Sequence, residues 1–173
     1  MRPSPGHLAA LALLVLIGLP PTREAAARRT SRTSFRDKTA GIQIFMPGEW
    51  VRQIRSAFPG VLATFKHPRL KARFVLAVRR RKLSETAPEL ARKNAAVLKA
   101  RKWKVGEPSS TRLGKLLAVQ VVAADVKGAT LVRQIYAVRG EFAYVLSLVA
   151  PVEVGARLEK DFLFVLKSTR FSR

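Results

Sequence analysis

Three apolar stretches in the C-terminal half of the sequence constrain the fold more than any other feature. Each has the length and the β-branched content of a β-strand. They cover residues 116–124, 130–138 and 142–150. The connections between them contain Gly128 and Gly140, and glycine supplies the positive φ that tight hairpin turns need. The sequence therefore predicts three consecutive strands that pair as an antiparallel meander.

Shorter segments upstream also have strand character. Pro47-Gly48 ends the first of them, and Trp50 begins a further extended segment. The predicted strands cover residues 42–46, 61–66, 73–80 and 103–105.

Two helices are expected. Thr86 and Glu89 have the spacing of a capping box, and Pro88 is tolerated in the first turn of a helix. The apolar face of this helix is predicted to contain Leu90, Ala91, Asn94, Val97 and Leu98. A second apolar helical face runs from about Glu153 to Lys167, after Pro151 has ended the last strand. The order strands, helix, strands, helix predicts an α+β fold rather than a parallel α/β fold.

The length of 173 residues predicts a single domain with an N-terminal extension. Residues 1–27 have the pattern of a signal peptide, because Arg2 precedes an apolar run over residues 8–19 that is shorter than the roughly 20 residues of a transmembrane helix. We expect residues 28–40 to be a basic flexible arm and residues 41–173 to be the folded domain. The protein is then exported to a periplasmic or extracellular location.

The chain carries 33 Lys and Arg residues against 11 Asp and Glu, which gives a net charge of +22. Fourteen of the basic residues lie in the basic sector, residues 66–104. This sector could contact the phosphates of a nucleic acid, an anionic membrane surface or an anionic envelope polymer, or it could be only a solubilising surface. The candidate contacts with an anionic partner are Arg79, Arg80, Arg81, Lys82, Arg101, Lys102 and Lys104.

Catalytic patterns are scarce. The sequence has no Cys, which excludes disulfides, thiolate metal sites and Cys nucleophiles. His67 is expected to be an exposed loop residue, and an enzyme would need scattered groups such as His67, Asp125 and Glu141 to converge. Glu159 and Asp161 are expected to lie on a solvated helix face, paired with the neighbouring Arg157 and Lys160. We expect no enzyme activity, no cofactor and no metal.

Several short motifs resemble the PsbP-like superfamily. The resemblance is carried by residues 41–50 (GIQIFMPGEW), the strand that ends near Arg79, the helix after residues 84–86 and the closing residues 165–171 (VLKSTRF). Membership implies a central antiparallel β-sheet flanked by two main helices, and a protein that binds partners rather than catalyses a reaction. The lipid-modified Cys of the lipoprotein members is missing, so covalent membrane anchoring is not expected.

Together these features predict an exported, non-enzymatic binding or accessory protein of the cell envelope. A protein or an anionic envelope component is the expected partner, and the protein is expected to be a monomer or a weak oligomer. The alternative is a binder of an anionic polymer, membrane surface or nucleic acid through residues 66–104. Nucleic acid is the less favoured partner, because a signal peptide would carry the protein away from it.

Overall fold

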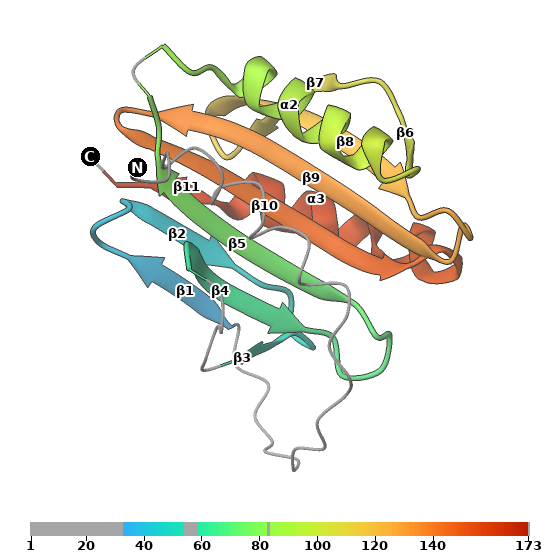
Figure 1. Ribbon diagram of the computed structural model, residues 1–173. Helices are drawn as coiled ribbons and strands as arrows, with labels where there is room; N and C mark the ends of the chain where they lie inside the picture. Colours follow the sequence, from blue (N-terminus) through green and yellow to red (C-terminus); the bar gives the residue numbers. More distant parts are fainter. Residues whose placement is uncertain (1–32, 54–58, 83, 173) are drawn as a thin grey trace.

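The computed structural model describes residues 33–53, 59–82 and 84–172 (Figure 1). Its centre is an eight-stranded antiparallel sheet in the order β3-β4-β5-β10-β9-β8-β6, in which β7 also pairs with β8. The strands are β3 (Val51–Gln53), β4 (Val61–Lys66), β5 (Arg73–Arg80), β6 (Lys104–Val105), β7 (Ser109–Leu113), β8 (Leu116–Ala124), β9 (Thr130–Arg139) and β10 (Phe142–Pro151).

The predicted meander is confirmed as β8, β9 and β10. β9 and β10 pair along their whole length, and Tyr136 of β9 lies opposite both Val145 and Val119 of its two neighbours. Gly128 and Gly140 form the turns with φ values of 68° and 54°. Both turns therefore favour a residue without a Cβ, as the sequence indicated.

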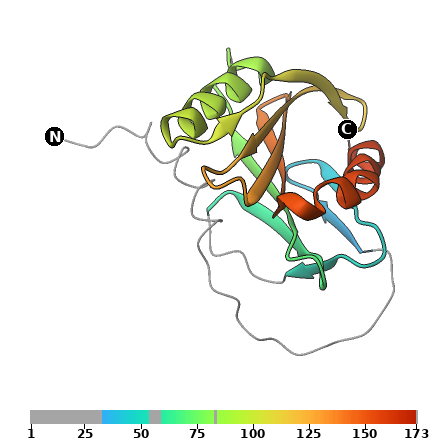
Figure 2. The same cartoon turned by 90° about the vertical axis from the view of Figure 1, so that its right-hand side faces the viewer.

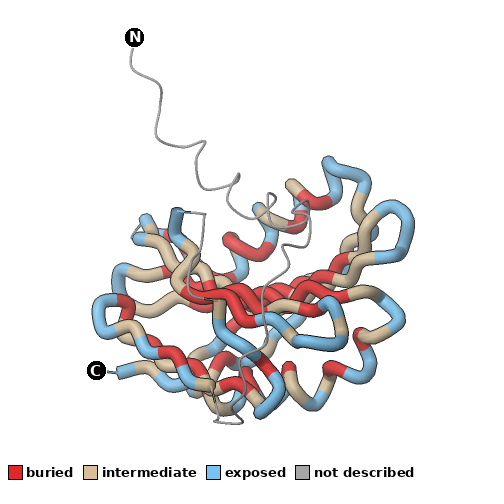
Figure 3. Tube along the Cα trace, turned by 90° about the horizontal axis from the view of Figure 1, so that it is seen from below, coloured by how far each residue is buried: buried red, intermediate tan, exposed pale blue. Residues whose placement is uncertain are grey.

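A second layer covers one face of the large sheet. It consists of a three-stranded sheet in the order β1-β2-β11 and of helix α3 (Figure 2). Their bounds are β1 (Ser34–Asp37), β2 (Ile42–Phe45), β11 (Arg170–Phe171) and α3 (Glu159–Ser168). The main hydrophobic core lies between the layers and joins Ile44, Phe74, Leu146 and Phe162, each no more than 1% exposed. Figure 3 shows the buried residues concentrated along the large sheet.

Helix α2 (Ala87–Ala100) packs on the opposite face of the large sheet, over β6, β8 and β9. The predicted capping box is confirmed: the Glu89 amide donates to Thr86 Oγ1 at 3.4 Å, and the Thr86 amide donates to Glu89 Oε2 at 2.8 Å. Leu90 and Ala91 bury the inner face of the helix against Tyr136. The fold is thus α+β, with an antiparallel sheet flanked by two main helices.

The N-terminal boundary of the folded domain was predicted too late in the sequence. Residues 28–40 were expected to form a flexible arm, but residues 34–37 are strand β1, which pairs with β2. Phe35 is only 6% exposed, so one apolar side chain anchors this polar segment to the core. The predicted signal peptide, residues 1–27, and residues 28–32 lie outside the described part of the chain.

Two further elements differ from the prediction. Strand β7 was not expected, because its sequence SSTRL is mostly polar and it lies at the edge of the sheet, where such residues face solvent. The continuous helix expected from about Glu153 begins as two 3₁₀ turns, η2 (Val152–Val154) and η3 (Ala156–Leu158), and becomes α-helical only at Glu159.

Gly114, in the β7–β8 turn, holds this edge hairpin against the end of α3. Its amide donates to the Leu166 carbonyl at 2.7 Å, and its φ is 57°. A Cβ at this position would lie 2.3 Å from the Thr169 carbonyl oxygen. Because that oxygen belongs to the backbone, it cannot rotate away as a side chain would.

We therefore expect Gly114→Ala to lower the free energy of unfolding by about 2–5 kcal/mol, through the left-handed backbone and the steric clash together. Gly128→Ala is the matched control, since Gly128 also has a positive φ but a Cβ at this position would meet nothing within 4 Å. The control should lose only about 1–2 kcal/mol. Equal losses in urea titrations of the two variants would show that the contact with α3 contributes nothing.

Candidate functional site

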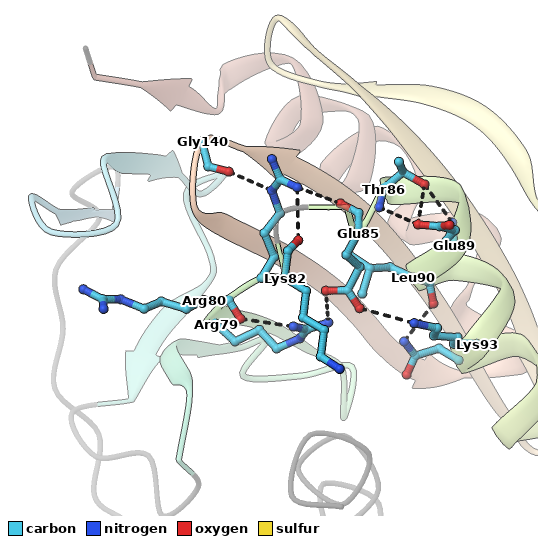
Figure 4. A network of polar contacts seen from close by, with 11 residues as sticks. Arg79, Arg80, Lys82, Glu85, Thr86, Glu89, Leu90, Lys93 and Gly140 are labelled. Atoms are coloured by element: carbon cyan, nitrogen blue, oxygen red, sulfur yellow. Dashed lines mark hydrogen bonds and ion pairs between the residues drawn. The ribbon is translucent and has the colours of Figure 1, made fainter. Parts of the chain in front are cut away.

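The arginine run at the end of β5 is tied into the fold at the N-terminal end of α2 (Figure 4). Arg79 donates to Glu85 Oε2 at 2.7 Å, and Lys93 of α2 lies 3.7 Å from the other oxygen of the same carboxylate. Glu85 is only 8% exposed, so this carboxylate needs its cationic partners. Arg79 and Lys93 therefore neutralise a buried charge where the chain enters α2.

Arg81 has a similar structural role. Its Nε donates to the Gly140 carbonyl at 2.7 Å, and its guanidinium also donates to the backbone carbonyls of Lys82 and Glu85. Arg80 is different, because its side chain is 81% exposed and lies 3.4 Å from Glu141 in the β9–β10 turn. Arg81 thus joins the β9–β10 turn to the segment before α2, and Arg79 holds the same segment through Glu85.

The other predicted contacts lie at the C-terminal end of α2. Arg101, Lys102 and Lys104 are all exposed, and the Arg101 amide caps the helix by donating to the Leu98 carbonyl at 3.1 Å. Within the described residues, no ion pair involves the side chains of these three residues or of Lys82. The seven predicted contacts thus form two groups, separated by the length of a 14-residue helix, or about 21 Å.

The solvent-facing side of α2 joins the two groups. Arg92, Lys93 and Lys99 are exposed along it, so cations continue from one end of the helix to the other. We call this surface the basic face; it consists of Lys82, Arg92, Lys93, Lys99, Arg101, Lys102 and Lys104. Two of its cations have acidic partners: Lys93 lies 3.7 Å from Glu85, and Lys99 lies 3.9 Å from Glu107. Glu89 is also nearby, and its pKa is held below its usual range by hydrogen bonds from Thr86, with smaller contributions from Lys93 and Arg92.

His67 is not an exposed loop residue as expected. Its side chain is 8% exposed and makes an edge contact with the ring of Trp50, with 5.2 Å between the ring centroids. Nδ1 accepts a hydrogen bond from the Arg69 amide at 3.2 Å, and Nε2 lies 3.4 Å from Glu49. The imidazole therefore closes the β4–β5 connection over the buried indole, which sequence spacing could not indicate because Glu49 is remote.

The three groups that an enzyme was expected to bring together lie apart. Strand β5 runs from Arg73 to Arg80. His67 lies near its Arg73 end, because the preceding residue of β4 pairs with Arg73. Glu141 lies near the opposite end, in the turn beside Arg80. Asp125 is in the β8–β9 turn, where it accepts a hydrogen bond from the Ala129 amide at 2.8 Å. These three side chains do not form one site.

The carboxylates of α3 make tertiary contacts, which corrects the expectation of a solvated face. Asp161 accepts a hydrogen bond from Trp50 Nε1 at 2.7 Å. Glu159 pairs with Arg133 of β9, whose guanidinium lies 4.1 Å from the centre of the Phe162 ring. Both carboxylates therefore hold α3 on the sheet instead of pairing with Arg157 and Lys160.

A shallow hollow of about 250 Å³ lies between β2 and the C-terminal end of α3. It is lined by Phe45, Phe164, Lys167, Ser168 and Arg170. The sequence prediction missed it, although a signal was present: residues 163 and 164 are apolar but fall outside the buried stripe formed by Phe162, Val165 and Leu166.

In the described part of the chain, no three His, Asp or Glu side chains are grouped so that they could hold a metal ion. None of the described helices has the length and hydropathy to cross a membrane.

The arrangement of the layers identifies the fold. An antiparallel sheet with α2 on one face, and with α3 and a small sheet on the other, is the PsbP-like fold that the sequence motifs indicated. Cyanobacterial PsbP from Synechocystis has this architecture: its solution structure superposes with a TM-score of 0.63 at 12% identity, over 87% of this chain and 98% of that one.

Two other solved structures are also similar. LpqN, a protein involved in cell envelope biogenesis of Mycobacterium tuberculosis, gives a TM-score of 0.62 at 15% identity, over 76% of this chain and 83% of its own. A protein of unknown function from Pseudomonas aeruginosa gives 0.55 at 15% identity, over 79% of this chain and 94% of its own. No family model and no curated protein matches the sequence. Because the sequence identities are only 12% and 15%, these comparisons establish a shared fold alone.

The contacts of Glu85 lead to a stability prediction. Glu85→Gln should lower the free energy of unfolding by about 1–2 kcal/mol, because it removes a buried charge that Arg79 and Lys93 share. Glu141→Gln is the matched control; its pair with Arg80 is exposed on both sides and should contribute about 0–1 kcal/mol. Chemical denaturation of both variants would measure the difference, and a neutral Glu85→Gln would contradict the structural role of Arg79.

Proposed function

We propose that the protein is an exported, non-enzymatic binding or accessory protein of the cell envelope. The signal-peptide pattern of residues 1–27 supports export. The PsbP-like fold supports an accessory role, since one protein with this fold, LpqN, is involved in cell envelope biogenesis. The separation of His67, Asp125 and Glu141 in the fold supports a non-enzymatic role, since these are groups that an enzyme could have brought together.

The basic face is the observation that carries the proposal. Lys82, Arg101, Lys102 and Lys104 extend into solvent, whereas Arg79 and Arg81 are used within the fold. Cations held close together on one surface repel one another, and an anionic surface relieves that repulsion. Near an anionic membrane each Lys or Arg contributes about 1 kcal/mol of attraction. Within the described residues, five of the seven cations form no ion pair, Lys93 and Lys99 being the exceptions, so the group could give useful affinity without a pocket.

The proposed partner of the basic face is therefore an anionic envelope surface, recognised by its phosphate or carboxylate groups. Such a surface is extended and needs no concave site, which agrees with the convex outer side of α2. Lipid headgroups and envelope polymers both carry phosphate groups, and vesicles and a soluble polyphosphate distinguish these two sources.

Export is tested on the native protein. We expect cell fractionation to recover it outside the cytoplasm, and N-terminal sequencing to begin near Arg28, because the sequence Ala25-Ala26-Ala27 offers a cleavage site. Retention in the cytosol with an intact N-terminus would contradict the proposal.

Surface binding is tested by reversing the charge of Arg101, Lys102 and Lys104 together. The wild-type protein should bind phosphatidylglycerol vesicles and a soluble polyphosphate in a salt-dependent manner, and should not bind phosphatidylcholine vesicles. The triple Glu variant should lose about 100-fold or more in affinity, since three attractive charges become repulsive. Cosedimentation and fluorescence anisotropy would measure this.

A matched control is available on other surfaces of the molecule. Arg36, Lys38 and Lys71 are exposed residues outside the basic face, and their reversal to Glu changes the net charge by the same amount. The control variant should keep most of the affinity. Equal losses in both variants would show that only net charge matters, and binding to duplex DNA in preference to both envelope probes would favour a nucleic-acid partner.

A further inference from the structure

The solvent-facing side of α3 carries apolar residues that the core does not use. Leu163 and Phe164 are 41% and 40% exposed, while Phe162, Val165 and Leu166 fill the core from the other side of the same helix. An amphipathic helix that packs on a sheet needs only one apolar face. The packing of α3 therefore does not explain why Leu163 and Phe164, on its other side, are also apolar. Exposed large apolar side chains that lie beside a hollow are typical of binding sites.

The hollow beside Phe164 is lined by two aromatic rings and two basic side chains. One of the rings is that of Phe45, over which the Arg170 guanidinium lies at 5.4 Å. Lys167 and Arg170 are both exposed, and within the described residues neither forms an ion pair with a carboxylate. Ser168 is already engaged, because its hydroxyl donates to backbone carbonyls of Phe45 and Val165.

The charges on α3 are separated by side. Glu159 pairs with Arg133 and Asp161 with Trp50, so both carboxylates have partners within the fold. Lys160 and Lys167 follow the helical spacing of Leu163 and Phe164 on the outside. The surface of the hollow therefore combines aromatic rings with positive charges, and it complements a ligand that combines an apolar side chain with carboxylates.

We propose that this hollow is a docking site for an acidic, extended segment of a partner protein, which inserts one bulky apolar side chain beside Phe164. A concave site of about 250 Å³ fits a single projecting side chain better than the broad surface of a bilayer. Lys167 and Arg170 then pair with carboxylates on either side of the inserted group. The site lies on the opposite side of the large sheet from α2 (Figure 2), so it does not depend on the basic face.

Two synthetic peptides of equal charge test the proposal with the full-length protein. The first has a central Phe flanked by two Asp residues on each side, and the second has Ala in place of the Phe. In ¹⁵N-resolved NMR titrations we expect the Phe peptide to shift the amide signals of β2 and the C-terminal half of α3, and to bind about tenfold or more tightly than the Ala peptide. Equal affinity of the two peptides would overturn the proposal, because it would leave only attraction by net charge.

Three variants locate the site. Phe164→Ala should remove the preference for the Phe peptide while its thermal unfolding stays close to wild type, because the side chain is 40% exposed. The double variant Lys167→Glu/Arg170→Glu should weaken both peptides. Leu117→Ala is the matched control: Leu117 is 74% exposed on β8 and should leave binding unchanged.

Two outcomes would reject the site as described. One is an unchanged preference for the Phe peptide in Phe164→Ala. The other is binding of phosphatidylglycerol vesicles that is lost in Phe164→Ala while neither peptide shifts α3, which would make this surface a membrane contact. The triple reversal of Arg101, Lys102 and Lys104 should not alter the preference for Phe over Ala, so failure of this site and failure of the basic face can be distinguished.

Discussion

Burial of Trp50 is the interaction on which the layered arrangement depends. The indole is 1% exposed and packs on Phe74 of the large sheet, with 4.6 Å between the ring centroids. A buried indole N–H needs an acceptor, and Asp161 of α3 supplies it at 2.7 Å. This one residue therefore joins the β2–β3 connection, the large sheet and α3. The bond also fixes how α3 is rotated about its axis, so Phe162 faces the core and Phe164 faces solvent.

Local sequence signals predicted most of the fold. Glycine turns and apolar runs located the meander, and the spacing of Thr86 and Glu89 located α2, because these signals depend on neighbours in the chain. β1 and β7 were missed, since both are short and polar and are held by partners far away in the sequence. The roles of His67 and Asp161 were missed for the same reason. Each is determined by Trp50, which is remote from Asp161 in the sequence but in contact with it in the fold.

The basic residues show that a run of charge in the sequence does not identify which cations are exposed. Adjacent arginines in the sequence have different environments: Arg79 and Arg81 hold the segment before α2, while Arg80 is largely exposed. The exposed cations lie instead along the outer side of α2 and at its two ends. The hollow beside Phe164 is lined by only two cations, and its aromatic residues are recognised only once it is known which face of α3 is buried. A protein of this kind can thus present two chemically different surfaces on opposite sides of one sheet.

The small sheet joins the two ends of the described chain. Its central strand, β2, pairs on one side with β1, the first strand, and on the other with β11, the last: Gln43 lies opposite both Arg36 and Arg170. The domain is therefore closed as a ring, without a disulfide, by backbone pairing and the packing of Phe35 and Phe171. Closing so long a loop costs entropy that is recovered only when both ends are in place. Because β1 and β11 both pair with β2 and not with each other, a cut within β2 would release both terminal strands, whereas new chain ends at an exposed hairpin would leave the ring closed.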